Sequence, residues 1–229
     1  RGTVAANYGR NAAMRKKVQA IAHHFPGRDI AIAVGRGAQA RWLLAERGDV
    51  LQGTRWHLYD PRQDSFQAIL DVAPLSAPPG HSANWLPPED LARKIPLSWT
   101  ASDGMRLYGY VSVPPGRDPA KLPLVALIHG GPWSAVGPAF DNGAQFLANR
   151  GYAVFEPNFR ASTGHGYRYQ MSAHGDFGGG GRVQRDIVEG VRHVLEQGIG
   201  DPQRVGIVGA SFGGYATLLG VSFNAGLFK

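Results

Sequence analysis

The segment of residues 205–213 constrains the fold of this chain most strongly, because it puts a tight turn directly between a strand and a helix. Residues 205–208 are apolar and strand-like, the sequence GASFG follows at 209–213, and a helix is predicted from Gly214 onward. This G-x-S-x-G pattern in a strand–turn–helix setting is typical of a nucleophile elbow. The turn strains the serine backbone and crowds neighbours that cannot carry a Cβ. Ser211 is thereby presented at a helix N-terminus, where developing negative charge is stabilised, and it is the candidate nucleophile.

A second glycine-rich turn follows the apolar run of residues 124–128. That run is expected of a strand buried on both faces of a sheet, and residues 129–132 after it have the sequence HGGP. An α/β-hydrolase aims two amide N–H groups at the oxyanion: one from the residue after the nucleophile and one from a loop after an early strand. We predict Phe212 and Gly131 as these two donors. The alternative is that both glycine clusters are only tight turns.

The elements after residue 122 predict an α/β domain, because strands alternate with helices as they do in a parallel sheet covered by helices. The predicted order is a strand at 124–128, a helix at 142–150, a strand at 152–155, a helix at 182–197, a strand at 205–208 and a helix from 214. A hairpin at 95–113, turning at 102–104, precedes these elements.

The first part of the chain has a different pattern. An amphipathic helix is predicted at 11–25 and is stopped by Pro26-Gly27. Short strand-like runs follow at 30–34, 41–45, 56–59 and 66–70, and the last two are separated by a hairpin-type loop. Residues 72–94 are rich in Pro, Ser and Ala, which indicates a linker.

A rival interpretation exists for this first part. The strand-like run before Gly35 leads into a G-x-G-x-x-A match at 35–40, and Asp60 stands 25 residues after Gly35. A dinucleotide-binding unit has such a pattern, which would make the protein an NAD-binding oxidoreductase. A helix over residues 38–48 would support this interpretation, and a strand would exclude it.

Four motifs together resemble the prolyl oligopeptidase family of serine peptidases, in particular its acylaminoacyl-peptidase and dipeptidyl-peptidase-like branch. They stand at residues 129–133 (HGGPW), 158–166 (NFRASTGHG), 201–202 (DP) and 209–215 (GASFGGY). The resemblance covers residues 95–229 well and 1–71 more loosely. It implies an α/β fold: 1–71 as the C-terminal part of a β-propeller, 72–94 as the linker, and 95–229 as the N-terminal part of an α/β-hydrolase catalytic domain, truncated after the nucleophile elbow.

The same resemblance implies a function. Ser211 is the nucleophile, Gly131 and Phe212 form the oxyanion hole, and the propeller admits only short peptides. The sequence departs from the family at Ala161, where glycine is usual, and at His165, where an aromatic residue such as tyrosine is usual. Both departures concern the shape of a loop near the site rather than the chemistry.

Four further side chains near the motifs have candidate roles. Trp133 and Tyr215 are candidate substrate-pocket residues, with core packing as the alternative for both. Arg160 and Asp186 are expected to form a structural ion pair or to brace a loop.

The acid and the base of a catalytic triad are missing from the predicted order. In α/β-hydrolases the acid and then the histidine follow the serine, but the 18 residues after Ser211 contain no Asp, Glu or His. We expect both residues beyond Lys229. The alternatives are a catalytically dead, hydrolase-like binding module, or an upstream histidine as the base, from a set that comprises His129, His165, His174 and His193.

Composition and charge argue against several other classes of protein. The net charge of +7 is spread along the chain, whereas nucleic-acid binding calls for clustered charge with interleaved aromatics. No apolar run approaches the ~20 residues of a membrane span. Zero cysteines exclude disulfides, Cys-ligated zinc, iron–sulfur clusters and a thiol nucleophile. The histidines and carboxylates lack metal-ligand spacing. We therefore expect no metal, no cofactor, no nucleic-acid partner and no membrane partner, and a bacterial cytoplasm or periplasm is favoured over a membrane.

The sequence thus predicts a serine peptidase that hydrolyses short peptides or acyl-peptides through an acyl-enzyme on Ser211, with a homo-oligomer as an option. The alternative within hydrolases is a carboxylesterase. The cleavage preference, the exo- or endopeptidase mode and the oligomeric state do not follow from the sequence.

Overall fold

The computed structural model describes residues 7–37, 40–71, 80 and 86–229. The chain divides into two compact units, one formed by residues 1–89 with Pro138–Asp141 and the other by Asp90–Gly137 with Asn142–Lys229. Most of the predicted linker at 72–94 lies outside the described residues. Each unit has its own sheet and its own core, so each is described by itself.

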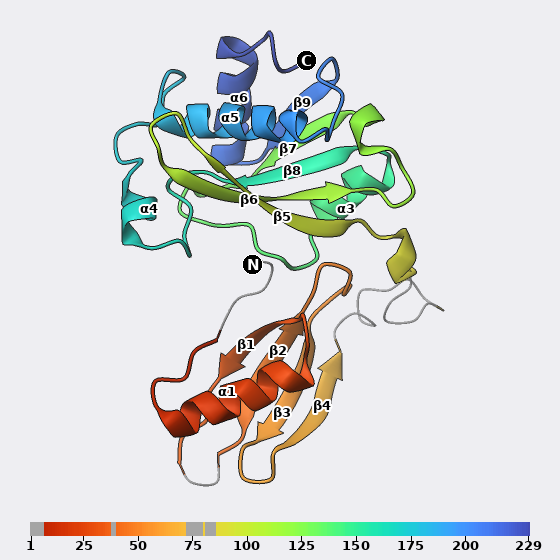
Figure 1. The fold of residues 1–229 in the computed structure, drawn as a ribbon, viewed down its shortest axis with the longest axis vertical. Helices are drawn as coiled ribbons and strands as arrows, with labels where there is room; N and C mark the ends of the chain where they lie inside the picture. Colours follow the sequence, from red (N-terminus) through yellow and green to blue (C-terminus); the bar gives the residue numbers. More distant parts are fainter. Residues whose placement is uncertain (1–6, 38–39, 72–79, 81–85) are drawn as a thin grey trace. The chain divides into compact units, whose positions relative to one another are not determined.

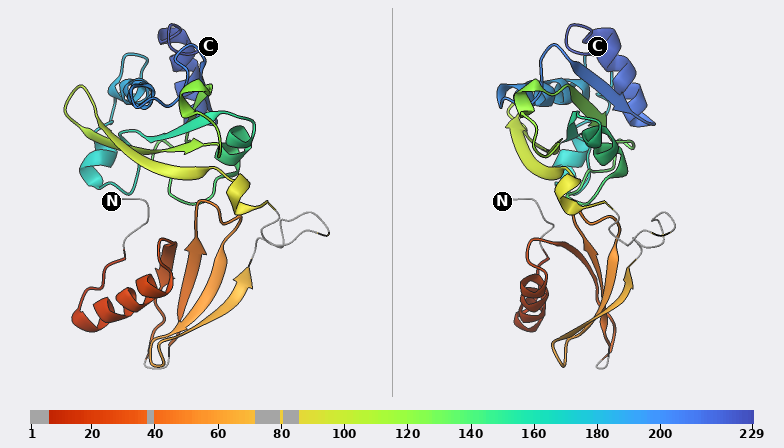
Figure 2. Two further views of the ribbon diagram at one scale, coloured as in Figure 1. Left: turned by 45° about the vertical axis from the view of Figure 1, so that its right-hand side comes forward. Right: turned by 90° about the vertical axis from the view of Figure 1, so that its right-hand side faces the viewer.

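The first unit is a four-stranded antiparallel meander covered on one face by a helix (Figure 2). The helix α1 spans Ala12–His24, and the side chain of Asn11 caps it by accepting a hydrogen bond from the amide of Met14 at 2.9 Å. The strands, in sheet order, are β1 (Asp29–Ala33), β2 (Trp42–Arg47), β3 (Arg55–Asp60) and β4 (Ser65–Asp71). The predicted helix and all four predicted strands are therefore confirmed, with ends shifted by one or two residues.

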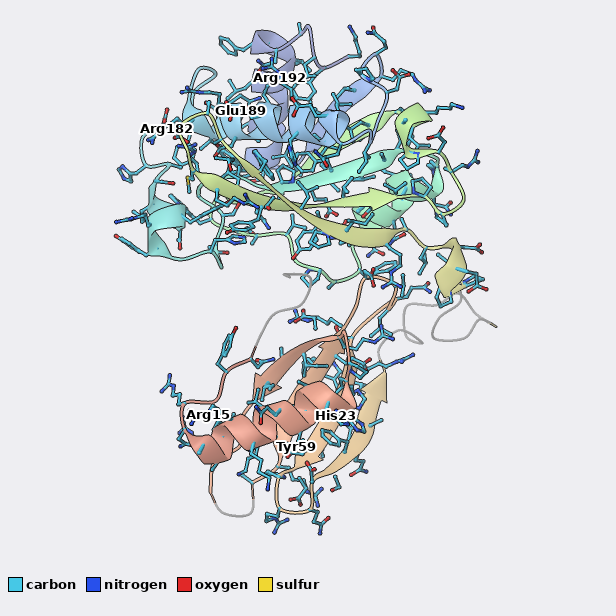
Figure 3. All side chains as sticks on the ribbon, viewed as in Figure 1. Arg15, His23, Tyr59, Arg182, Glu189 and Arg192 are labelled. Atoms are coloured by element: carbon cyan, nitrogen blue, oxygen red, sulfur yellow. The ribbon has the colours of Figure 1, made fainter. Side chains whose placement is uncertain are left out.

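The core of this unit lies between α1 and the sheet. Ile21 and Phe25 on the helix side pack with Trp42 and Leu44 of β2 and with Tyr59 of β3. Figure 3 labels Arg15 and His23 on α1 and Tyr59 on β3. The amphipathic pattern of the helix and the alternation of the strands thus meet at one apolar interface.

The strand β2 overturns the dinucleotide-binding interpretation. Residues 42–47 would have to form the helix after the glycine turn, but they pair antiparallel with both β1 and β3, so that Leu44 lies opposite Ile32 on one side and His57 on the other. The glycine at position 35 has a packing reason instead, because a Cβ there would overlap the carbonyl oxygen of Arg41. The NAD-binding alternative is therefore wrong.

The second unit is built on a five-stranded mixed sheet with the order β5-β6-β8-β7-β9 (Figure 1). The hairpin β5 (Arg93–Thr100) and β6 (Arg106–Val113) joins β8 (Ala153–Asn158) in antiparallel fashion. The strand β7 (Leu124–Ile128) lies between β8 and β9 (Val205–Gly209) and is parallel to both. The predicted parallel sheet is thus confirmed for these three strands, and the predicted hairpin extends it.

Helices cover both faces of this sheet. The alternate residues Leu124, Ala126 and Ile128 of β7 belong to the main core, which also holds the apolar face of α5 (Arg182–Glu196) and part of α6 (Phe212–Phe223). Leu127 packs instead with the small cluster around α3 (Asn142–Asn149). Because successive strand residues point to opposite faces, α3 covers one face and α5 with α6 the other. This two-sided burial explains why β7 is a continuous apolar run.

Three short elements remain. The helix α4 (Tyr167–Met171) was not predicted, and two 3-10 turns span Pro88–Asp90 and Pro119–Lys121. The helix α6 begins at Phe212, two residues before the predicted start. In the part of the chain that the structure describes, no helix combines the length and apolarity needed to cross a membrane.

Candidate active site

The turn at residues 209–213 holds Ser211 in a backbone conformation that L-residues rarely adopt, with φ 57° and ψ −123°. Ser211 follows β9, occupies the N-cap position of α6 and is exposed to solvent. The glycines on either side have no room for a side chain. A Cβ on Gly209 would lie 2.6 Å from the carbonyl oxygen of Ile128, and a Cβ on Gly213 would overlap the same oxygen. The expectation that the turn crowds positions that cannot carry a Cβ is confirmed for Gly209 and Gly213.

Phe212 occupies the first position of α6, directly after Ser211. Helix geometry leaves the first amides of a helix without an intrahelical acceptor, so this N–H is available to an anion. The ring of Phe212 points into the unit, where its centroid lies 5.5 Å from that of Phe159 and 5.6 Å from that of Phe177. The ring thus fixes the residue while the amide stays at the helix end.

The loop after β7 approaches Ser211 through Gly130. A Cβ added to Gly130 would lie 3.5 Å from the Cβ and 3.9 Å from the Oγ of Ser211, so the loop passes beside the serine with room for about one atom between them. Gly131 has φ 132°, and a Cβ there would lie 2.6 Å from the amide nitrogen of Trp133. The structure therefore brings Ser211, Phe212 and the HGGP loop together, and the sequence reasoning assigned no role to Gly130, which lies beside the serine. The donor role of Gly131 stays a prediction.

The two candidate pocket residues are on the surface. Trp133 is 55% exposed and Tyr215 is 43% exposed, so core packing does not account for either ring. Tyr215 lies beside Phe212, with ring centroids 5.8 Å apart. Their role in a substrate pocket stays a prediction.

His129 is engaged by its own loop. Its Nδ1 lies 2.8 Å from the carbonyl oxygen of Gly130, which can only accept, so Nδ1 carries the proton. Burial lowers the pKa of His129, against the opposing hydrogen bond to Gly130, and in the neutral ring Nε2 accepts from the hydroxyl of Ser162 at 2.9 Å. With both nitrogens occupied, His129 is unsuited to take a proton from Ser211.

A neighbouring segment, residues 158–163, holds the loop after β7 in place, and we call it the bracing loop. The side-chain amide of Asn158 donates to the carbonyl of Val136 at 2.9 Å and accepts from its amide at 2.8 Å. The amide of Thr163 donates to the carbonyl of Ser134 at 2.8 Å. Sequence reasoning assigned no role to Asn158 or Ser162, although both stand inside the motif at 158–166.

The bracing loop is itself anchored by Arg160, which is buried. Its guanidinium donates to both carboxylate oxygens of Asp186 on α5 at 2.7 Å, and to those of Asp103 in the β5–β6 turn at 2.6 and 3.1 Å. Burial alone would lower the pKa of Arg160, but the hydrogen bonds to Asp186 and Asp103 outweigh burial and hold it above its usual value. The expected ion pair between Arg160 and Asp186 is confirmed.

The structure also explains the two departures from the family pattern. Ala161 has φ 90° and is fully buried, so it stands where the backbone favours glycine. His165 stacks on Tyr108 with ring centroids 4.9 Å apart and planes 3° from parallel, and it contacts Tyr169 at 4.8 Å. Burial lowers the pKa of His165, which favours the neutral ring. The histidine therefore fills the place of an aromatic residue as a flat, uncharged ring.

No group of three or more histidine, cysteine, aspartate or glutamate side chains that could hold a metal ion occurs within residues 7–37, 40–71, 80 and 86–229. The chemistry that the described site offers is a serine hydroxyl beside backbone amides.

Comparison with known proteins shows which proteins this chain resembles. Residues 138–229 match the family model described as "Prolyl oligopeptidase family". The chain is 36% identical over 145 residues to the dipeptidyl aminopeptidase BIII of Pseudoxanthomonas mexicana, covering 60% of this chain and 21% of that protein. It is 35% identical over 109 residues to the acylamino-acid-releasing enzyme of Arabidopsis thaliana, covering 47% and 14%. The predicted family resemblance is confirmed.

Solved structures show the same fold. A puromycin-hydrolyzing peptidase of Mycobacterium tuberculosis superposes with a TM-score of 0.72 at 22% identity, over 89% of this chain and 30% of that one. An acylaminoacyl peptidase of Pyrococcus horikoshii gives a TM-score of 0.68 at 21% identity, over 88% and 30%. The predicted fold class, an α/β-hydrolase part preceded by a propeller part, is confirmed. The chain spans about a fifth of the length of the first curated relative, 21%.

Proposed function

We propose that this chain, which matches the prolyl oligopeptidase family at residues 138–229, is the nucleophile-bearing part of a serine peptidase acting on short peptides or acyl-peptides. One observation carries the proposal. An exposed serine in a strained conformation stands at the N-terminus of α6, and the glycine loop after β7 passes so close that a Cβ added to Gly130 would lie 3.9 Å from its Oγ. Strain of this kind persists where the surrounding structure enforces it, and it is concentrated at active sites.

In the proposed reaction, the Oγ of Ser211 attacks the carbonyl carbon of the peptide bond. A general base takes the hydroxyl proton and passes it to the leaving amine, and water then hydrolyses the acyl-enzyme. The amide N–H groups of Phe212 and Gly131 stabilise the oxyanion, and loss of one such donor typically costs about 3–4 kcal/mol of transition-state stabilisation.

The proposal assigns the base and its orienting acid to a segment after Lys229, in the order found in α/β-hydrolases. Among the upstream histidines, His129 is occupied by Gly130 and Ser162, and His165 stacks on Tyr108 and contacts Tyr169. The proposal also retains the division into a propeller part at 1–71, a linker at 72–94 and a catalytic part at 95–229.

The substrate class rests on the relatives. Their names describe release of dipeptides and of acylated amino acids, and both reactions cleave near one end of a peptide. The competing functions are a carboxylesterase, which would use the same nucleophile, and a binding module without turnover.

A fluorophosphonate probe tests the nucleophile in the full-length protein that contains this chain. Labelling is expected in the wild type and in Ser222→Ala, which changes an exposed serine on the same helix, and it is expected to vanish in Ser211→Ala. Absence of Ser211-dependent labelling would identify the binding module. Turnover of aminoacyl esters without turnover of dipeptidyl or acyl-aminoacyl anilides would identify the esterase.

A further inference from the structure

We propose that Ser162 is a positioning residue for the oxyanion hole: through the ring of His129 it sets the orientation of the peptide group between Gly130 and Gly131. The inference rests on the proposed function. It assigns a role in catalysis to a buried serine that is not adjacent to the nucleophile.

One peptide bond joins Gly130 to Gly131. The carbonyl oxygen of Gly130 and the amide hydrogen of Gly131 belong to the same planar unit and point in opposite directions in a trans peptide. Fixing the oxygen therefore fixes the direction of the N–H. A glycine pair has little steric preference of its own, so without an external hold this plane is free to rotate.

His129 supplies that hold. Its Nδ1–H donates to the oxygen of Gly130 at 2.8 Å, and its ring lies flat on Phe159 with centroids 4.4 Å apart. A hydrogen bond to the carbonyl also polarises the peptide group, which strengthens the N–H on its other end as a donor. The ring must, however, keep its proton on Nδ1 to act in this way.

Ser162 holds the ring at the angle that this contact needs. Its side chain is fully buried, and its hydroxyl lies 2.9 Å from Nε2 of His129. Because the histidine proton is on Nδ1, facing the carbonyl of Gly130, the hydroxyl donates to Nε2 and keeps the ring in that orientation. The relay from Ser162 through His129 to Gly130 thus ends on the peptide group whose N–H is the predicted donor.

Ser162, the residue at which this relay begins, is held rigidly. The amide of Ser162 donates to the carbonyl of Phe159 at 3.0 Å, and the preceding Arg160 is clamped between Asp103 and Asp186. The far end of the supported loop is fixed by the two hydrogen bonds between Asn158 and Val136. Ser162 is therefore a fixed reference point rather than a side chain that follows the loop.

The test compares Ser162→Ala with Ser112→Ala in the full-length protein. Ser112 is equally buried, and its hydroxyl lacks a hydrogen-bond partner within the described residues, so it controls for the loss of a buried oxygen. For Ser162→Ala we expect kcat to fall about tenfold to a hundredfold with KM nearly unchanged. Affinity for a peptide aldehyde, which forms the oxyanion, should fall by the same factor, while affinity for a product peptide should not.

A second variant keeps the test informative if Ser162→Ala is poorly folded. His129→Phe retains the stack on Phe159 and removes both hydrogen bonds. It should reproduce the loss in kcat, and the double variant should lose no more than His129→Phe alone, because both substitutions break one relay.

Three outcomes would overturn the inference: equal kcat in Ser162→Ala and Ser112→Ala, additive losses in the double variant, or a product-peptide affinity that falls together with that of the aldehyde. Each of these presupposes a wild type with Ser211-dependent turnover. A wild type without such turnover overturns the proposed function itself, and the inference with it.

Discussion

Two turns of the second unit force a non-glycine residue into a left-handed or otherwise strained backbone: the elbow at 209–213 and the bracing loop at 158–163. Ser211 has φ 57° and Ala161 has φ 90°. In the elbow, the strain is maintained by backbone packing, because Gly209 and Gly213 lie directly against Ile128. In the bracing loop, it is maintained by side chains, chiefly Arg160 between its two carboxylates.

The two turns are therefore sensitive to different kinds of substitution. Backbone packing tolerates no added atoms, so the elbow is sensitive to the smallest increase in volume. A charged network tolerates no missing partner, so the bracing loop is sensitive to the loss of a charge and to pH. Only the elbow requires its strained side chain for the proposed chemistry, because the hydroxyl of Ser211 reacts whereas the methyl of Ala161 only packs.

The largest effect is expected from Arg160→Met, which leaves Asp186 as a buried carboxylate without its cation. Loss of one partner of a buried pair costs about 3–5 kcal/mol of unfolding free energy, to be measured by denaturant titration. Arg204→Met is the control, because that arginine is exposed and pairs with Asp201 at the surface, so its loss should cost under about 1 kcal/mol. An equal loss of unfolding free energy in the two variants would contradict the conclusion that side chains hold the bracing loop in place.

The same variant should acquire a characteristic pH dependence. Burial raises the pKa of Asp186 even against the pull of Arg160, and without the guanidinium the rise should be larger. A raised pKa in the folded state means that protonation favours folding, so the variant should regain stability as the pH falls through that pKa. A destabilisation that stays constant from neutral to mildly acidic pH would refute this.

Gly213→Ala is expected to have the next largest effect on stability and to abolish turnover. Its Cβ would overlap the carbonyl oxygen of Ile128, so the backbone of the elbow must move, at a cost of about 1–3 kcal/mol or more. Thermal unfolding and fluorophosphonate labelling measure the two effects. Gly178→Ala is the matched control, because a Cβ there meets nothing within 4 Å. A fully active Gly213→Ala would show that the elbow is not held by packing.

Replacing each strained residue by glycine separates function from strain. Ser211→Gly should raise the unfolding free energy by about 1 kcal/mol, because it relieves a disfavoured conformation at an exposed site, and should lose all labelling. Ala161→Gly relieves similar strain but removes a fully buried methyl worth about 0.8 kcal/mol, so its stability should change little. A gain for Ala161→Gly that equals the gain for Ser211→Gly would remove the distinction between the two turns.

The smallest effect is expected from Asp103→Asn. The hydrogen bond from Arg160 holds the pKa of Asp103 below its usual value. Its stabilising contribution is therefore complete above the ordinary carboxyl pKa, about 4, and is lost as the pH falls below it. Because the side chain is 35% exposed, water screens the pair and the loss at neutral pH should be under about 1 kcal/mol. The wild-type and variant unfolding free energies should converge in acid, and a difference that persists there would contradict this assignment.

Much of the fold could be predicted because its signals are local. The run at 124–128 is apolar throughout and becomes β7, and the alternating strands of the first unit become β1 to β4. The helix α4 was missed because its five residues provide too little periodicity. The start of α6 was placed late because two glycines in its first turn lower the helix propensity.

The site could be predicted only in part. The roles proposed for Ser211 and Phe212 follow from a contiguous sequence pattern, whereas the approach of Gly130 to Ser211 joins residues 81 positions apart. The hydrogen bond between Ser162 and His129 joins residues 33 positions apart in the sequence. The hydrogen bond between Arg160 and Asp103 joins residues 57 positions apart. Such contacts depend on the order β8-β7-β9, which local periodicity does not encode.

That strand order has a consequence for divergence. The bracing loop, the HGGP loop and the elbow leave the ends of three adjacent parallel strands, whose spacing of about 4.8 Å is imposed by main-chain pairing. The distances among the three loops are thus set by main-chain hydrogen bonds, which residues other than proline can make whatever their side chains. The side chains of the strands can therefore be substituted during evolution, as long as their volume and apolar character are kept. This accounts for superposition with an acylaminoacyl peptidase at 21% identity.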